Sequence, residues 1–180
     1  NLYEYPTTER MEVDGKRRYV IKGQTEPLPS VTTILAATQS EEKKASLAAW
    51  RTRVGASEAD HIRDTAAARG TVMHHILEGW IKDEPHVDLT PVGQLAEKMA
   101  YQIWDQGITN KLNECWGLEV TLYYPGLYAG ATDLVGLYEN VESIIDFKQS
   151  NKPKRREWIE DYKLQLAAYA LAHNEIYGTN

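Results

Sequence analysis

Two segments carry most of the information on the fold of this chain: Gly130-Ala131-Thr132-Asp133-Leu134-Val135-Gly136 and Ser143-Ile144-Ile145-Asp146-Phe147-Lys148-Gln149. Both segments are rich in apolar residues, and the turn signal Glu139-Asn140 lies between them. This pattern predicts two strands, 128–138 and 143–149, that pair as a hairpin. Residues i and i+2 of a strand share a face, so Asp146 and Lys148 are expected to point the same way.

The predicted hairpin can place two carboxylates, those of Asp133 and Asp146, side by side. Two carboxylates at such a short distance repel one another unless they share a proton or a cation. Mg²⁺ or Mn²⁺ is the cation that suits oxygen ligands best, and Lys148 beside such an ion could position or polarise a water molecule. The residues alone also allow a plainer interpretation, which is a structural ion-pair cluster at the edge of a sheet.

This order of residues, Gly-x-x-Asp and then Asp-x-Lys at a strand end before a helix, resembles the PD-(D/E)xK nuclease superfamily. The RecB-like exonuclease branch is the most similar part of it, because residues 69–74 and 165–169 resemble two helix motifs of that branch. Residues 29–35 are similar to the start of the mitochondrial genome maintenance exonucleases and their phage relatives. One departure is Gln149, which stands where the family often has threonine.

The resemblance implies an α/β (α+β) nuclease core, with a mostly antiparallel central sheet flanked by helices and an N-terminal helical region over the cleft. It implies a metal-dependent DNA exonuclease that hydrolyses phosphodiester bonds and prefers single-stranded ends. The implied ligands of the Mg²⁺ or Mn²⁺ cofactor are His74, Asp133, Asp146 and the carbonyl of Phe147. The implied catalytic residues are Lys148, which orients the attacking water, Gln165 and Tyr169, which support the lysine and the phosphate, and Glu119 on the first strand.

Two adjacent histidines differ in their place on the helix predicted over 58–83. Its apolar stripe centres near Met73 and Leu77. At about 100° per residue, His74 lies roughly 90° from that centre and His75 lies roughly opposite it. His74 is therefore expected to look into a cleft beside the core, and His75 is expected in solvent.

Other features have both a functional and an ordinary interpretation. Gly70 indicates either the close approach of another backbone or nucleic-acid strand, or a break between two helices. The five tryptophans and eleven tyrosines could include stacking platforms for unpaired bases, although most will lie in the core. The cluster Lys152, Lys154, Arg155 and Arg156 could contact backbone phosphates or form a solvated loop, and His61, His86 and His173 are predicted on the surface.

Composition limits the class of protein. The chain has 180 residues and a net charge of −6, from 20 basic and 26 acidic residues, whereas a non-specific nucleic-acid coat protein is normally basic. Its single cysteine, Cys115, excludes an intrachain disulfide and an iron–sulfur cluster held by this chain alone. We expect a protein without membrane partners in a reducing compartment, the cytoplasm of a bacterium or a phage-infected host, with single-stranded DNA as its partner.

The sequence predicts one nuclease domain over 1–180, truncated at its C-terminus. Residues 1–115 form a mainly helical part after an N-terminal hairpin, and residues 116–180 form the catalytic sheet and helix. The predicted elements are a hairpin over 9–22, a short helix after Ser30, helices over 41–54, 58–83 and 92–115, strands over 117–124, 128–138 and 143–149, and a helix over 157–176.

Two alternatives to the exonuclease remain open at this stage. One is a nucleic-acid binding module whose metal site no longer cuts. The other is an enzyme of different chemistry, such as a metal-dependent endonuclease or phosphatase. Digestion of linear and circular single strands separates an exonuclease from an endonuclease.

Overall fold

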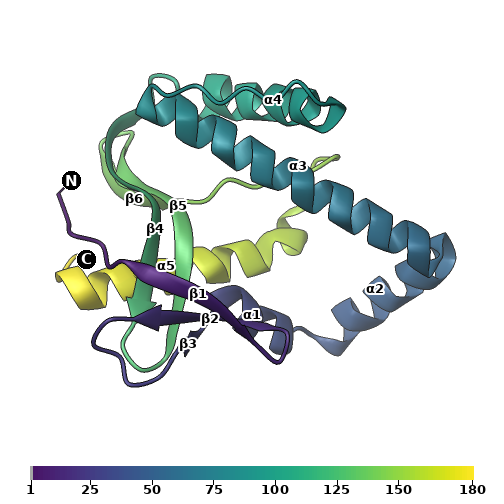
Figure 1. The fold of residues 1–180 in the computed structure, drawn as a ribbon, viewed down its shortest axis with the longest axis horizontal. Helices are drawn as coiled ribbons and strands as arrows, with labels where there is room; N and C mark the ends of the chain where they lie inside the picture. The colour runs from purple at the N-terminus through teal and green to yellow at the C-terminus, as the bar shows by residue number, and fades with distance from the viewer. Residues whose placement is uncertain (1) are drawn as a thin grey trace. The chain divides into compact units, whose positions relative to one another are not determined.

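Figure 1 shows the computed structural model, which describes residues 2–180. In these residues the protein has a mixed α/β fold with two antiparallel three-stranded sheets and five α-helices. The strands are β1 (Thr8–Val13), β2 (Lys16–Ile21), β3 (Leu28–Pro29), β4 (Leu112–Tyr124), β5 (Tyr128–Tyr138) and β6 (Val141–Ile145). The helices are α1 (Val31–Ala37), α2 (Glu41–Val54), α3 (Ala56–Lys82), α4 (Pro91–Ile103) and α5 (Glu160–Tyr177), with a π-helix η1 (Trp104–Ile108) and a 3₁₀ turn η2 (Arg156–Ile159).

The turn and cap signals of the sequence are confirmed. Strands β1 and β2 pair across Asp14-Gly15, and both residues adopt the positive φ that such a turn requires. Helix α1 begins after Ser30, whose hydroxyl accepts a hydrogen bond from the Thr33 N–H at 3.0 Å. Strands β4, β5 and β6 form the expected meander, with β5 in the centre.

Two predicted boundaries are wrong. The strand predicted over 143–149 ends at Ile145, so Asp146, Phe147 and Lys148 follow β6 instead of lying in it. The helix predicted over 92–115 gives way to the π-helix η1, and β4 already begins at Leu112. Strand β4 extends this far because its first residues pair with the end of β5, which local periodicity does not report.

The chain forms two compact units. The first, the sheet unit, comprises the residues up to Thr38 together with Lys111–Asp146 and Ser150–Asn180. The second, the helical unit, comprises Gln39–Asn110 and the short segment Phe147–Gln149. The N-terminal hairpin and α1 thus belong with the second sheet, although more than seventy residues separate them in sequence.

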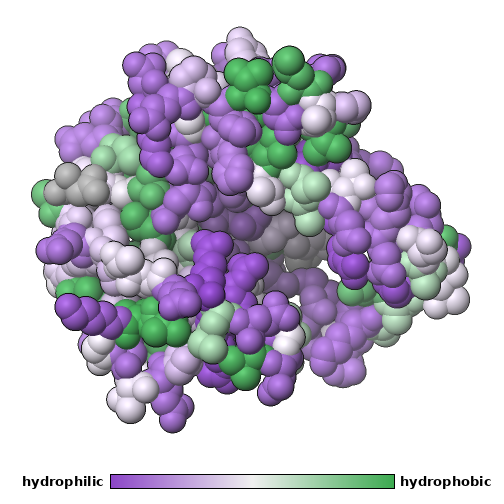
Figure 2. All heavy atoms as spheres, in the orientation of Figure 1, coloured by the Kyte–Doolittle hydropathy of each residue, from purple (hydrophilic) through white to green (hydrophobic). Residues whose placement is uncertain are grey.

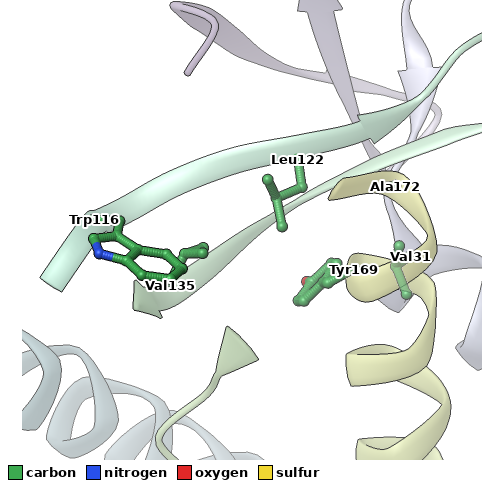
Figure 3. Close-up of a cluster of buried hydrophobic side chains, with 6 residues drawn as sticks. All are labelled: Val31, Trp116, Leu122, Val135, Tyr169 and Ala172. Carbon is green, nitrogen blue, oxygen red and sulfur yellow. The ribbon is translucent and has the colours of Figure 1, made fainter. Parts of the chain in front are cut away.

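The core of the sheet unit lies between the β4–β5–β6 sheet and α5 (Figure 3). Helix α5 contributes Tyr169 and Ala172, and the strands contribute Trp116, Leu122 and Val135. Strand β2 and the start of β5 form a second cluster with Leu28. Removing these apolar side chains from water is what holds the antiparallel strands and α5 together.

The helical unit is built on α3, which runs without interruption for 27 residues. The alternative of a helix break at Gly70 is therefore wrong. Met73, Ile76 and Leu77 form its buried stripe, as the periodicity predicted. Hydrophobic side chains also lie on the surface over α4 (Figure 2). No helix within residues 2–180 is both long enough and apolar enough to cross a membrane.

Candidate metal centre

Three carboxylates of the sheet unit lie in one row across the second sheet. Leu118 pairs with Leu134 and Val120 pairs with Thr132, so the register sets Glu119 across from Asp133. Leu134 pairs with Ile145, and the same register continued by one residue sets Asp133 across from Asp146. The hairpin argument from sequence therefore holds for the two aspartates. Neighbouring strands lie about 4.8 Å apart, which keeps the three groups close.

The carboxylates of this row differ in exposure. Asp133 is 5% exposed, Asp146 is half-buried with its Oδ2 atom buried, and Glu119 is exposed. One carboxylate oxygen of Glu119 lies within 4.8 Å of one from Asp133. Burying negative charge side by side is costly unless positive charge compensates it. The row is thus a place where a cation would relieve repulsion.

Backbone irregularities in β4 set the position of Glu119. Glu119 has a φ of +53°, which is rare for a residue with a side chain. The β4–β5 register also shifts between Cys115 and Gly117, opposite Gly136 and Val135. A β-bulge of this kind turns a side chain in a new direction and is common beside functional sites. The sequence carried one signal of it, the glycines Gly117 and Gly136.

Helix α5 contributes a buried polar pair to the sheet unit. The Gln165 Nε2 donates to the Tyr169 hydroxyl at 2.9 Å, and both side chains are buried. Burial raises the pKa of Tyr169, and the charges of Asp146 and Asp133 add to that effect. Tyr169 is therefore a neutral hydrogen-bond donor at physiological pH, near both aspartates.

Gly130 makes room for this tyrosine. A Cβ atom at Gly130 would lie 2.5 Å from Cε1 of Tyr169 and 2.7 Å from its hydroxyl oxygen. The glycine of the Gly-x-x-Asp segment therefore has a steric reason to be there. It admits the phenol against the strand that carries Asp133.

In the helical unit, His74 contacts the segment that follows Asp146. Its Nε2 lies 3.0 Å from the carbonyl oxygen of Phe147. A carbonyl oxygen can only accept, so Nε2 donates and carries the proton. His74 is half-buried and His75 is exposed, as the helix phase predicted. The side chain of Lys148 is exposed.

Gln149 anchors the same segment to α3, a contact that the sequence did not predict. Its Nε2 donates to the carbonyl of Ala66, and its Oε1 accepts from Arg69 Nε at 2.5 Å. A Cβ atom at Gly70 would lie 2.9 Å from the Gln149 Nε2. Gly70 thus permits a close approach, and the group that approaches is the side chain of Gln149.

The prediction for one histidine is wrong. His173 is buried instead of lying on the surface, and burial lowers its pKa. Tyr3 and Tyr5 of the N-terminal segment pack around its ring. This covering by a segment about 170 residues away is a tertiary effect with no local signal.

No protein-family model matches this chain, and no curated protein matches it either. The functional interpretation therefore depends on the motifs and geometry of this chain. Two parts of the structure matter most for this interpretation, the carboxylate row of the sheet unit and the segment from Phe147 to Gln149 in the helical unit.

Proposed function

We propose that this protein is a metal-dependent deoxyribonuclease with a PD-(D/E)xK-type core, and that it acts as an exonuclease on single-stranded ends. The observation that carries the proposal is the row of Glu119 on β4, Asp133 on β5 and Asp146 directly after the end of β6. Lys148 follows two residues after the last of them. A carboxylate row with a nearby lysine matches the needs of metal-dependent phosphodiester hydrolysis, which is the chemistry that the sequence motifs imply.

The donor atoms fit a hard divalent cation. Two oxygens on opposite sides of one Mg²⁺ are about 4.2 Å apart, and neighbouring ligands are about 3 Å apart. The bound of 4.8 Å between Glu119 and Asp133 oxygens requires little adjustment. The His74 Nε2 now directs its proton at the Phe147 oxygen at 3.0 Å, so this hydrogen bond must break before both atoms can face one cation. Carboxylate, carbonyl and imidazole donors suit Mg²⁺ or Mn²⁺.

The ligands implied by the sequence motifs are Asp133 and Asp146 of the sheet unit, and His74 and the carbonyl of Phe147 of the helical unit. When bound, the divalent cation supplies Lewis-acid polarisation of the phosphate and a lower pKa for water. His74 carries its proton on Nε2, so Nε2 can act as a ligand only in the other neutral tautomer, in which Nδ1 holds the proton.

The other side chains of the proposed site orient the attacking water and stabilise the charge on the phosphate. The ammonium group of Lys148 holds the attacking water and offsets the charge that develops on the phosphate. The Tyr169 hydroxyl oxygen accepts a hydrogen bond from Gln165. The O–H group of Tyr169 can donate a hydrogen bond to a phosphate oxygen, without transfer of the proton. Its raised pKa keeps that proton in place. These roles need no change in the protonation of Tyr169 during the reaction.

The two neighbouring histidines provide a matched pair of variants. We expect His74→Ala to lower the rate of metal-dependent cleavage by at least about tenfold, the loss typical when a ligand or its support is removed. We expect His75→Ala to cleave at the wild-type rate, because its ring is exposed and contacts the ring of another exposed histidine, His86. Initial rates on labelled single-stranded DNA measure both. Equal rates in the two variants would show that His74 has no part in the reaction.

The proposed preference for single strands has an electrostatic basis. A net charge of −6 gives little long-range attraction for duplex DNA, whose dense charge favours a broad basic face. The basic cluster at Lys152, Lys154, Arg155 and Arg156 is short, enough to follow one backbone. A single strand is therefore the better match for the charges of this chain.

The proposed function is tested with one end-labelled oligonucleotide in three forms: single-stranded, annealed to its complement, and ligated into a circle. Each is incubated with Mg²⁺, Mn²⁺ or EDTA. We expect cleavage of the linear single strand with either cation, slower cleavage of the duplex, and neither cleavage of the circle nor activity in EDTA. Rapid cleavage of the circle would indicate an endonuclease. Binding of the DNA without cleavage would indicate a binding module. Cleavage in EDTA would refute the metal dependence.

A further inference from the structure

A short segment of the sheet unit, from Lys152 to Tyr162, brings cations together with two aromatic side chains. The Arg155 guanidinium lies over the Trp158 ring, with its central carbon 5.4 Å from the ring centroid. The Lys154 ammonium lies 4.8 Å from the centroid of the Tyr162 ring and donates to its hydroxyl at 2.5 Å. Two cation–aromatic pairs thus lie within a few residues of one another.

The backbone builds the first of these pairs. The N–H of Trp158 donates to the carbonyl of Arg155 at 3.0 Å, at the start of the 3₁₀ turn η2. In a 3₁₀ turn the side chains at positions i and i+3 lie above one another. The turn therefore holds the guanidinium and the indole together in a defined arrangement.

This segment keeps its tryptophan and its cations at the surface, whereas Tyr162 is half-buried. Trp158 is 57% exposed, although a tryptophan in a core buries roughly 150–250 Å². Its cationic neighbours, Lys152, Lys154, Arg155 and Arg156, are all exposed as well. The segment also carries three acidic residues, Glu157, Glu160 and Asp161, which follow the cations in the chain. An uncovered indole next to the Arg155 guanidinium suits a ligand that is flat and apolar in one part and anionic in another.

We propose that residues 152–162 form a binding site for single-stranded nucleic acid, in which Trp158 stacks on a base and the cations contact phosphates. A nucleotide strand has both required parts, an aromatic base and an anionic backbone. A base can stack on Trp158 only when it is unpaired, so the site selects a single strand over a duplex. This inference extends the proposed nuclease function, because the segment begins four residues after Lys148 in the chain.

The test measures binding without cleavage, by fluorescence anisotropy of a labelled single-stranded DNA with the full chain in EDTA. We expect Trp158→Ala to weaken binding by about 5- to 150-fold, the range for loss of one base stack. Trp158→Phe, which keeps a ring, should recover most of the affinity. Leu164→Ala is the matched control, since Leu164 is 55% exposed on α5 and lies outside both cation–aromatic pairs.

Two further arms separate stacking from charge. A strand of the same length that lacks its bases should bind the wild-type protein and Trp158→Ala equally weakly. Log affinity falls as log salt concentration rises. Exchange of both Lys154 and Arg155 for glutamine should make this fall less steep, reducing the magnitude of the slope by about 1.4, or 0.7 for each phosphate contact. Trp158→Ala should leave that slope unchanged.

Three results would overturn the inference. The first is that Trp158→Ala and Leu164→Ala bind the single strand with equal affinity. The second is that the wild-type protein binds duplex and single strand with equal affinity. The third is that the protein binds anionic phosphatidylserine vesicles, in place of DNA, in a way that depends on Trp158. Failure of the nuclease proposal is a separate result, because it is seen as an absence of cleavage with Mg²⁺ or Mn²⁺ whatever the binding in EDTA.

Discussion

Replacing Lys148 by alanine is expected to lower the rate of DNA cleavage by at least about a hundredfold. In the proposed mechanism its ammonium group stabilises charge that develops on the phosphate, and loss of one such group typically costs about 10²–10³ in kcat. The side chain is exposed and follows the end of β6, so its truncation should leave the apolar core and the stability unchanged. Initial rates on end-labelled single-stranded DNA with Mn²⁺, beside urea unfolding curves, measure both quantities.

A second lysine of the helical unit provides the control for this variant. Lys98 is exposed on α4 and contributes the same charge, so Lys98→Ala should cleave at the wild-type rate. Lys148→Arg should remain well below the wild-type rate, because a planar guanidinium presents its donors in a different geometry. Cleavage by Lys148→Ala at the wild-type rate would remove Lys148 from the mechanism.

Gly136→Ala is expected to destabilise the protein by about 3 kcal/mol, the upper end of the range for inserting a methyl group into a packed core. A Cβ atom at this position in the central strand β5 would collide with the backbone carbonyl of Glu114 in β4. A backbone atom cannot rotate away as a side chain can, so the two strands would have to separate at the β-bulge. Urea unfolding curves measure the loss of unfolding free energy, provided that the dependence of this free energy on urea concentration is the same in both proteins.

The matched control for this variant is Gly107→Ala. The nearest atom to a Cβ there is the Ile103 Cγ2 at 3.9 Å, an ordinary contact distance. Alanine should therefore be neutral or slightly stabilising at that helical position. If Gly136→Ala loses less than about 0.5 kcal/mol, within the range of an ordinary surface substitution, the close approach of β4 to Gly136 is not as tight as described.

The Gly136 variant also bears on the proposed site. The same β-bulge sets the register that brings Glu119 across from Asp133. A shift of one residue in this register would turn the side chains of β4 to the opposite face of the sheet. We therefore regard the bulge as part of the site, although neither Gly136 nor Glu114 is a proposed ligand.

The elements that could be predicted from the amino-acid sequence are those whose signals are local. A turn dipeptide and a capping serine fixed the first hairpin and the start of α1, because their hydrogen bonds reach only three or four residues. The apolar period of 3.6 located α3 and separated His74 from His75. The meander β4–β5–β6 followed from short connections between strands, and with it the pairing that brings Asp133 across from Asp146.

The features that depend on distant partners could not be predicted and became visible only in the folded chain. Strand β4 begins at Leu112, where the sequence still reads as helix, because Tyr138 pairs with it. His173 is buried by Tyr3 and Tyr5, and Gln149 bonds to α3 about 80 residues away. Local periodicity reports which face of an element is apolar, but not which segment will cover it. That choice is made by packing and by hydrogen bonds between residues far apart in the chain.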